Sequence, residues 1–595
     1  MRYLMSTVAA LAIGAMCTAA LAENGEMRTS VRLDSMQPVT DARLQNPEPQ
    51  NWLTWRGNYE GWGHSPLDQI NAGNVKDLVP VWSYSTGVTE GHQAPPMVND
   101  GIMYVSTPQN QVIALDAVTG NEIWRYVREL PEDLFQLHPT NRGVALYGDK
   151  VYMATVDAGV VALDAKTGEV VWDVTVGDYT DGYYSTLSLL AADGKVITGV
   201  SGGEYGIRGY VVALDAETGA EAWKTYTIPG PGEPGHETWK GESWKTGGAP
   251  VWMQPTYDHE KGLIYAGTGN GGPWMPDTRP GDNLYATSVI ALDIRDGKIK
   301  GHHQYHWNDA WDWDEVSAPL LIPIERDGRK VEGLVHAGRN GYLWALERTA
   351  EGPINFVAAD PYVIQNVFTS IDPKTGRPTY DVEKTPGTNK TVTFCPSLWG
   401  GKDWPPEAYN PDTGLVYIPS HDNLCSELGG VEIGEREPGE LYIGIPIDVI
   451  LSSLRFHESV DTSKPVPIGK LQAWDVDTGK RVWEHAFHDT PYWGPILSTA
   501  GNLLFTGGTA DRKFRAFDAT SGEMLWEFPT NSGVTAAPSS FEVDGVQYIA
   551  VQSGWGVDAE RMQALLKDML PEGRVWNVPQ GGAIWVFALK DKAGE

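Results

Sequence analysis

A short phrase that recurs along the chain constrains the fold most strongly. It reads ALDAVTGNEIW at 114–124, ALDAKTGEVVW at 162–172, ALDAETGAEAW at 213–223, AWDVDTGKRVW at 473–483 and AFDATSGEMLW at 516–526. In each copy apolar residues end one strand, an Asp followed by Thr-Gly or Ser-Gly forms a turn, and Trp begins the next strand. The phrase therefore predicts repeated units of short antiparallel strands.

The spacing of the phrase identifies the kind of repeat. Adjacent copies recur with a period of roughly 50 residues, which suits a β-propeller blade and exceeds a leucine-rich or ankyrin unit. The numbers of Gly, Trp and Tyr (67, 24 and 25) also favour an all-β chain with many turns. We predict an eight-bladed β-propeller in one domain, 23–595, with seven blades as the alternative.

Three insertions interrupt the repeats, at 229–250, 426–465 and 558–582. The last contains a predicted helix from Ala559 to Leu570. Long loops on a rigid scaffold usually form a lid, a substrate wall or a docking face.

The first residues, MRYLMSTVAALAIGAMCTAALA, read as a signal peptide, 1–22, with cleavage after Ala22. Its apolar run is too short to cross a membrane, and no later stretch of the sequence is long enough. We therefore expect a periplasmic protein without a membrane span. Removal of the signal leaves Cys395 and Cys425 in an oxidising compartment, where we expect them to form a disulfide.

The formal net charge of −32 makes nucleic acid an unsuitable partner. An acidic surface suits a basic protein partner, although solubility alone explains it equally well.

The stretch GHHQYHWNDAWDWDEVS, 301–317, is the densest group of carboxylates and indoles in the chain. Carboxylates buried among indoles need a cation or hydrogen-bond donors. In an extended segment Asp312 and Asp314 face the same side and could hold one ion. The alternative is a solvated acidic turn.

The blade phrase occurs together with SGGEYGIRG, GTGNGGPW, WNDAWDWD, GRNGYLWALER and CPSLWGGKDWPP. In this order the motifs resemble the quinoprotein alcohol dehydrogenases, which depend on pyrroloquinoline quinone (PQQ). The resemblance implies oxidation of a primary or secondary alcohol, such as a polyol, sugar or bulky alcohol, by hydride transfer to metal-bound PQQ. The sequence contains no Cys-x-x-Cys-His haem motif, so electrons would pass to a separate cytochrome c.

The resemblance also assigns the metal ligands. Glu204, Asn270 and Asp312 would hold the ion, and Asp312 would act as the general base. Asp314 adds a carboxylate that is typical of lanthanide-using relatives, so Ca²⁺ and a lanthanide both remain open. Asp309 and Glu315 are then expected to be ordinary loop acids.

Arg339 would support the charge that develops on the quinone oxygens, unless it is an exposed turn residue. Trp252 would stack under the cofactor, and Arg142 would pair with a cofactor carboxylate. Core packing is the alternative for each Trp. The full set of implied cofactor contacts is Gln93, Arg142, Thr186, Ser201, Gly202, Gly203, Glu204, Trp252, Arg339, Asp403, Trp404 and Trp493.

Two departures from the family pattern affect the cofactor pocket. Gln136 and Leu137 stand where many members carry adjacent cysteines above the quinone, and Gln93 stands where a glutamate is common. We expect a roomier pocket, walled by Trp307, Trp313, Leu137, His138 and the insertions. The alternatives in function are a non-catalytic periplasmic scaffold and a quinoprotein that acts on aldehydes or amines.

Overall fold

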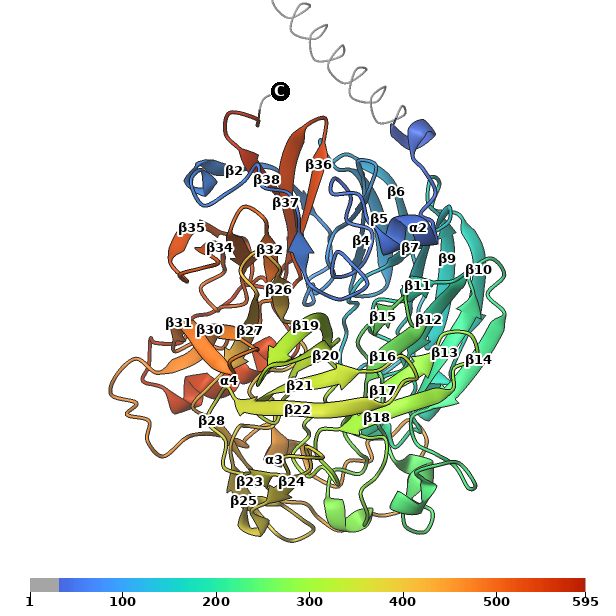
Figure 1. The fold of residues 1–595 in the computed structure, drawn as a ribbon, viewed down its shortest axis with the longest axis vertical. Helices are drawn as coiled ribbons and strands as arrows, with labels where there is room; N and C mark the ends of the chain where they lie inside the picture. Colours follow the sequence, from blue (N-terminus) through green and yellow to red (C-terminus); the bar gives the residue numbers. More distant parts are fainter. Residues whose placement is uncertain (1–31, 594–595) are drawn as a thin grey trace, which may run out of the picture.

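The computed structural model describes residues 32–593, so the predicted signal peptide lies outside the described residues. Within this range the chain forms eight sheets of at least four strands. Following the colours in Figure 1, the chain passes once around the molecule, and its red end returns beside its blue start.

The strands of the eight sheets follow the chain almost in order. They are β3 (Met97–Asn99), β4 (Ile102–Thr107), β5 (Gln111–Asp116) and β6 (Glu122–Val127); β7 (Ala145–Tyr147), β8 (Lys150–Ala154), β9 (Gly159–Asp164) and β10 (Val170–Thr175); β11 (Leu190–Ala192), β12 (Lys195–Gly199), β13 (Tyr210–Asp215) and β14 (Glu221–Tyr226); β15 (Thr256–Asp258), β16 (Leu263–Gly267), β17 (Ser288–Asp293) and β18 (Ile299–Gln304); β19 (Leu320–Arg326), β20 (Arg329–Ala337), β21 (Tyr342–Arg348) and β22 (Ile354–Pro361); β26 (Ala408–Asn410), β27 (Leu415–His421), β30 (Pro467–Asp475) and β31 (Lys480–His488); β32 (Leu497–Thr499), β33 (Leu503–Thr506), β34 (Lys513–Asp518) and β35 (Met524–Pro529), with β1 (His64–Ser65) beside β32; and β36 (Ser539–Val543), β37 (Val546–Ser553) and β38 (Ala583–Leu589) with β2 (Leu78–Ser85).

The last of these sheets closes the ring. Strand β2 comes from the start of the chain and pairs antiparallel with β38 at its end, with Leu78 opposite Leu589. Closure of this kind joins the two ends of the described chain in one sheet and removes the need for an open edge there.

Trp residues, most of them from the repeated phrase, lock several of the sheets to the next. The indole N–H of Trp124 on β6 donates to the carbonyl of Ala165, 3.1 Å away, in the turn after β9. A Cβ on Gly168 of that turn would lie 2.6 Å from the Trp124 ring, so only glycine allows this approach. The same indole-to-carbonyl contact joins Trp82 to Ala117, Trp172 to Ala216, Trp223 to Ile294, Trp483 to Ala519 and Trp526 to Leu78.

The elements outside the eight sheets are short. They are α2 (Asp41–Gln45), η1 (Val75–Asp77), η2 (Tyr179–Asp181), η3 (Gly203–Tyr205), η4 (His236–Thr238), η5 (Ser243–Thr246), η6 (Pro276–Thr278), η7 (Val382–Lys384), α3 (Ile447–Ile450), α4 (Asp558–Met569), the pair β23 (Phe368–Ile371) and β24 (Pro378–Tyr380), and the sheet of β25 (Val392–Phe394), β28 (Leu424–Leu428) and β29 (Leu454–Phe456). Helix α4 begins and ends one residue earlier than the sequence predicts.

Cys395 and Cys425 form the predicted disulfide, which ties the end of β25 to β28. Within 32–593, no helix has the length and apolar character that crossing a bilayer requires.

Candidate active site

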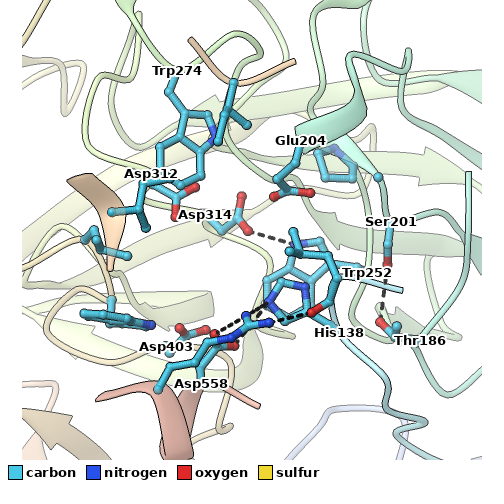
Figure 2. Close-up of a pocket in the computed structure, with 18 of the residues that line it drawn as sticks. His138, Thr186, Ser201, Glu204, Trp252, Trp274, Asp312, Asp314, Asp403 and Asp558 are labelled. Atoms are coloured by element: carbon cyan, nitrogen blue, oxygen red, sulfur yellow. Dashed lines mark hydrogen bonds and ion pairs between the residues drawn. The ribbon is translucent and has the colours of Figure 1, made fainter. Parts of the chain in front are cut away.

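A cavity of about 290 Å³ receives side chains from the loops of several sheets and from the three insertions. Figure 2 shows Glu204, Asp312 and Asp314 in one part of it, with His138, Asp403 and Asp558 in another. The predicted site residues that line this cavity are Arg142, Thr186, Ser201, Gly202, Glu204, Trp252, Asp312, Asp314, Arg339 and Asp403. The fold therefore brings together residues that are far apart in the sequence.

Three of the carboxylates that line the cavity, Glu204, Asp312 and Asp314, lie together and are largely desolvated. Burial raises the pKa of Glu204 and of Asp314, and it raises the pKa of Asp312 well above its usual range, against the opposing effect of Arg339. Repulsion adds to this effect, because Asp314 raises the pKa of Glu204, and Asp314 and Glu204 raise the pKa of Asp312. Such a cluster is stabilised by a bound cation.

Asp312 and Asp314 reach the cavity by a different backbone from the one expected. Asp312 has φ of 63°, so the segment is not an extended strand. The Asp309 carboxylate holds this conformation by accepting from the N–H of Asp312 at 3.1 Å and, more weakly, from that of Trp313 at 3.4 Å. The prediction that Asp309 is an ordinary loop acid is therefore wrong, because it is buried and shapes the loop.

Glu315 is also buried rather than solvated, so the same prediction for this residue is wrong. Its carboxylate accepts from Nε2 of His336 at 2.6 Å and from Nδ2 of Asn340 at 2.8 Å, and it lies 3.4 Å from Nδ1 of His306. Burial alone would raise its pKa, but the hydrogen bonds from His306 and His336 lower it to about 2. Glu315 also accepts a hydrogen bond from the backbone N–H of Arg339 at 3.2 Å, and it thus fixes the turn that carries Arg339.

Arg339 is paired with a buried carboxylate in the lining of the cavity. Its Nη2 donates to Oδ1 of Asp403 at 2.6 Å, and its Nη1 donates to the carbonyl of Asp312 at 2.9 Å. Burial raises the pKa of Asp403 to about 6 against the effect of this guanidinium. These contacts hold Arg339 in one orientation, with Nε buried and without a partner among the described residues.

Trp252 forms the flat surface of the cavity. The guanidinium carbon of Arg142 lies 4.7 Å from the centre of its indole, and that of Arg339 lies 5.9 Å away. Arg142 is held by a 2.6 Å hydrogen bond to the hydroxyl of Thr186, and burial lowers its pKa to about 10. An aromatic face between two cations suits a planar anion.

The other predicted site residues lie outside the cavity lining, and their predicted roles stay predictions. Asn270 stands directly behind it, with Nδ2 2.8 Å from Oδ1 of Asp312 and its N–H 2.5 Å from Oδ1 of Asp314. Trp404 contacts Arg142 at 5.0 Å, and Trp493 packs on His421. Gly203 and Gln93 are both buried, and they are the sequence neighbours of Glu204 and His92.

The predicted walls of the cavity are correct in part. Leu137 and His138 line it, whereas Trp313 is fully buried and donates to the carbonyl of Ser397, and Trp307 stacks on Tyr380. As predicted for the insertions, part of the wall comes from 426–465, and this part is aliphatic. It consists of Leu441, Ile443, Ile447, Ile450 and Leu451, facing Trp274, Leu398 and Trp399.

Two ionised residues of the cavity were not anticipated. Asp558 and Arg561 reach it from α4, in the 558–582 insertion. The sequence pattern of this insertion predicts the helix, but the position of the helix beside the site depends on tertiary packing.

Known proteins of one family are similar to this chain in sequence and in fold. The family described as glucose/ethanol/alcohol dehydrogenase, β-propeller domain, matches residues 52–367 and 368–549. A quinoprotein alcohol dehydrogenase of Pseudomonas putida, PedH, is 38% identical over 580 residues, covering 92% of each chain. A quinohemoprotein alcohol dehydrogenase of Comamonas testosteroni is 39% identical over 531 residues, covering 85% of this chain and 73% of its own. A structure titled europium-containing methanol dehydrogenase superposes with a TM-score of 0.83 at 33% identity, covering 92% of this chain and 100% of its own.

The cavity, the ring of sheets and these similarities agree on one conclusion. The chain is an oxidoreductase that belongs to the PQQ-dependent quinoprotein alcohol dehydrogenase family.

Proposed function

We propose that this enzyme oxidises primary or secondary alcohols that carry a bulky apolar group, using PQQ and one Ca²⁺ or lanthanide ion. The observation that carries the proposal is the composition of the cavity. Three desolvated carboxylates and Arg339 occupy one part, and the aliphatic residues of the 426–465 insertion form a wall.

The residues of the cavity fit PQQ, which is planar and carries several carboxylates. Trp252 provides a flat face, while Arg142 and Arg339 provide two buried cations beside it. Thr186 and Ser201 add hydroxyl groups. Nε of Arg142 and Nε of Arg339 are both buried without a hydrogen-bond partner in the described part of the chain, as expected if they have an anionic ligand.

The same cavity fits a hard cation. Within residues 32–593, no three His, Cys, Asp or Glu side chains stand close enough together to form a metal site unaided. Glu204, Asp312 and the amide of Asn270 would therefore hold the ion together with oxygen atoms of the cofactor. The europium in the related structure and the extra carboxylate of Asp314 support a lanthanide, with Ca²⁺ as the other candidate.

When bound, PQQ supplies the electron acceptor and the ion supplies a Lewis acid. Asp312 accepts the hydroxyl proton of the alcohol at its carboxylate. Arg339, fixed by Asp403, donates hydrogen bonds toward developing negative charge. The aliphatic wall excludes water from these groups.

The aliphatic wall distinguishes among the expected substrates. The insertion is attached to the site itself, because the N–H of Tyr442 donates to the carbonyl of Glu204 at 2.6 Å and the carbonyl of Ile443 accepts from Trp274 at 3.0 Å. Contacts with an apolar wall stabilise a bound alkyl or aryl group. They leave the extra hydroxyls of a sugar or polyol without hydrogen-bond partners. We therefore favour bulky apolar alcohols over sugars and polyols.

The partner and compartment belong to the same proposal. The leader-like start of the sequence supports export to the periplasm, and the net charge of −32 suits electrostatic steering of a basic cytochrome c. Reduction of such a cytochrome by the purified enzyme, weakening as salt rises, is the expected observation.

The proposed activity is tested by loading the full-length protein with PQQ and either Ca²⁺ or La³⁺, then following dye reduction with methanol, ethanol, 1-hexanol, a benzylic alcohol, glycerol and sorbitol. We expect kcat/KM to rise with the size of the apolar group. Failure to turn over any of these alcohols with either ion, or a preference for methanol or sorbitol, contradicts the proposal.

A further inference from the structure

Helix α4 borders the cavity and holds the segment that contains Leu137 and His138. Nη2 of Arg561 donates to the carbonyl of Leu137 at 2.6 Å, and Nη1 donates to Nε2 of His138 at 3.1 Å. Oδ2 of Asp558 lies 3.4 Å from the same imidazole nitrogen. Figure 2 shows His138 and Asp558 reaching toward each other inside the cavity.

These contacts reinforce one another. Nη1 of Arg561 also donates to Oδ1 of Asp558 at 3.1 Å, so the two α4 side chains orient each other. A neutral His138 accepts from Arg561, and a protonated His138 donates to Asp558. The imidazole therefore has a partner on α4 in either protonation state. On its other side, Nδ1 lies 3.4 Å from the hydroxyl of Tyr184.

The two sides of this contact differ in how firmly they are fixed. Helix α4 is anchored by the buried side chains of Ala559, Met562 and Leu566, and by a 2.6 Å hydrogen bond from Trp555 to Gln563. The segment 131–140 contains turns and bends but no strand or helix, and its Phe135 is 63% exposed. The helix thus holds the segment, and not the reverse.

We infer that Asp558 and Arg561 are positioning residues that form an ionic latch, holding Leu137 and His138 against the cofactor pocket so that the cofactor is retained. This inference rests on the proposed function, because the latch faces the cavity assigned there to PQQ. The segment carries Gln136 and Leu137 in place of the adjacent cysteines of many family members, so the latch contacts that hold it are non-covalent.

The latch is tested on full-length protein loaded with PQQ and Ca²⁺. Arg561→Met keeps most of the side-chain length but removes the donors, and Asp558→Asn removes the charge with little change in shape. Glu560→Gln is the matched control, because Glu560 is an exposed acid on the same helix. Release of PQQ into a chelating buffer is followed by recovery of tryptophan fluorescence, and hydrogen exchange is measured for peptides that cover 131–140.

We expect PQQ to leave Arg561→Met and Asp558→Asn at least tenfold faster than the parent, with faster exchange in 131–140 and an unchanged midpoint of urea unfolding. Glu560→Gln should match the parent. Release within twofold of the parent in both folded variants overturns the latch, as does faster release that is accompanied by an equal loss of global stability. Should Arg561→Met not fold, Asp558→Asn decides alone. A parent protein that does not retain PQQ would instead contradict the proposed function.

Discussion

The indole N–H of Trp252 donates a hydrogen bond to Oδ2 of Asp314, 2.8 Å away. This contact links the flat face proposed for the cofactor to the carboxylate proposed to select the metal ion. Oδ1 of Asp314 accepts from the N–H of Asn270, another proposed ligand. Asp314 is therefore held in place from two sides, and its charge is directed into the cavity rather than toward solvent.

Replacing Asp314 should change the choice of ion. Asp314→Asn keeps an oxygen for the Trp252 indole and removes only the charge, whereas Asp314→Ala removes both. A trivalent ion gains more from an added anion than Ca²⁺ does, so both variants should lose lanthanide activation while any calcium activity changes little. Titration of the PQQ-loaded protein with La³⁺ and Ca²⁺ measures this. An unchanged ratio of the two affinities would show that Asp314 has only the structural role.

Replacing Asp312 should remove the chemical step and leave cofactor binding. Asp312→Asn cannot accept the hydroxyl proton, and loss of a general base typically lowers kcat by about 10²–10⁴-fold. The variant should still bind PQQ, which its absorbance on the purified protein will show. A kcat within tenfold of the parent, at full PQQ occupancy, would assign the base elsewhere.

His306 should make stability depend on pH. Burial works against its charged form, but hydrogen bonds to Asp309 and Glu315 raise its pKa from 6.5 to about 9. The folded protein therefore binds an extra proton between these values. Its contribution to stability is complete below about pH 6.5 and is lost as the pH rises through about 9.

His306→Gln should lower the free energy of unfolding by roughly 3–5 kcal/mol at neutral pH, because it leaves buried carboxylates without their cation. It should also flatten the decline of stability toward alkaline pH. Urea unfolding across pH 6–10 measures both effects, with exposed His488→Gln as the control. Equal alkaline losses in His306→Gln and the parent would exclude His306 as their source.

The roles of Asp309, Glu315 and His306 show what the sequence does not reveal. The repeated phrase predicts the strands and turns because its signals are local. The cavity residues could be identified because short motifs carry them. In contrast, whether an acid is solvated or buried depends on partners such as His336 on β20 and Asn340 in the turn after it, which lie more than 20 residues from Glu315 in the sequence.

The insertions also show that the sequence predicts local structure but not long-range contacts. Their presence at 426–465 and 558–582 was evident from the interrupted period, and the α4 helix was predicted within one residue at each end. Their placement at the cavity follows from long-range contacts, such as Tyr442 to Glu204 and Arg561 to Leu137. No local pattern encodes these contacts.

Removal of the disulfide should destabilise the protein without affecting its chemistry. Cys395 and Cys425 are 30 residues apart, and closing a loop of this length contributes about 3–4 kcal/mol in the chain-entropy model. The double variant Cys395→Ser/Cys425→Ser should unfold at a lower urea concentration, while kcat of the folded fraction is retained. A parent protein treated with reductant should behave in the same way. No change in the unfolding midpoint would contradict this.

Shortening the aliphatic wall should alter substrate preference. Ile450 lines the cavity and is only partly buried, so Ile450→Ala shortens the wall and enlarges the cavity there. Loss of apolar contact on this scale is worth about 1–3 kcal/mol to a substrate that fills the space. We expect kcat/KM for 1-hexanol to fall about tenfold or more, with ethanol nearly unchanged. Val382→Ala provides the control, because Val382 is 68% exposed and lies outside the cavity lining. A uniform loss for both alcohols would mean that the insertion supports the fold of the site rather than selecting the substrate.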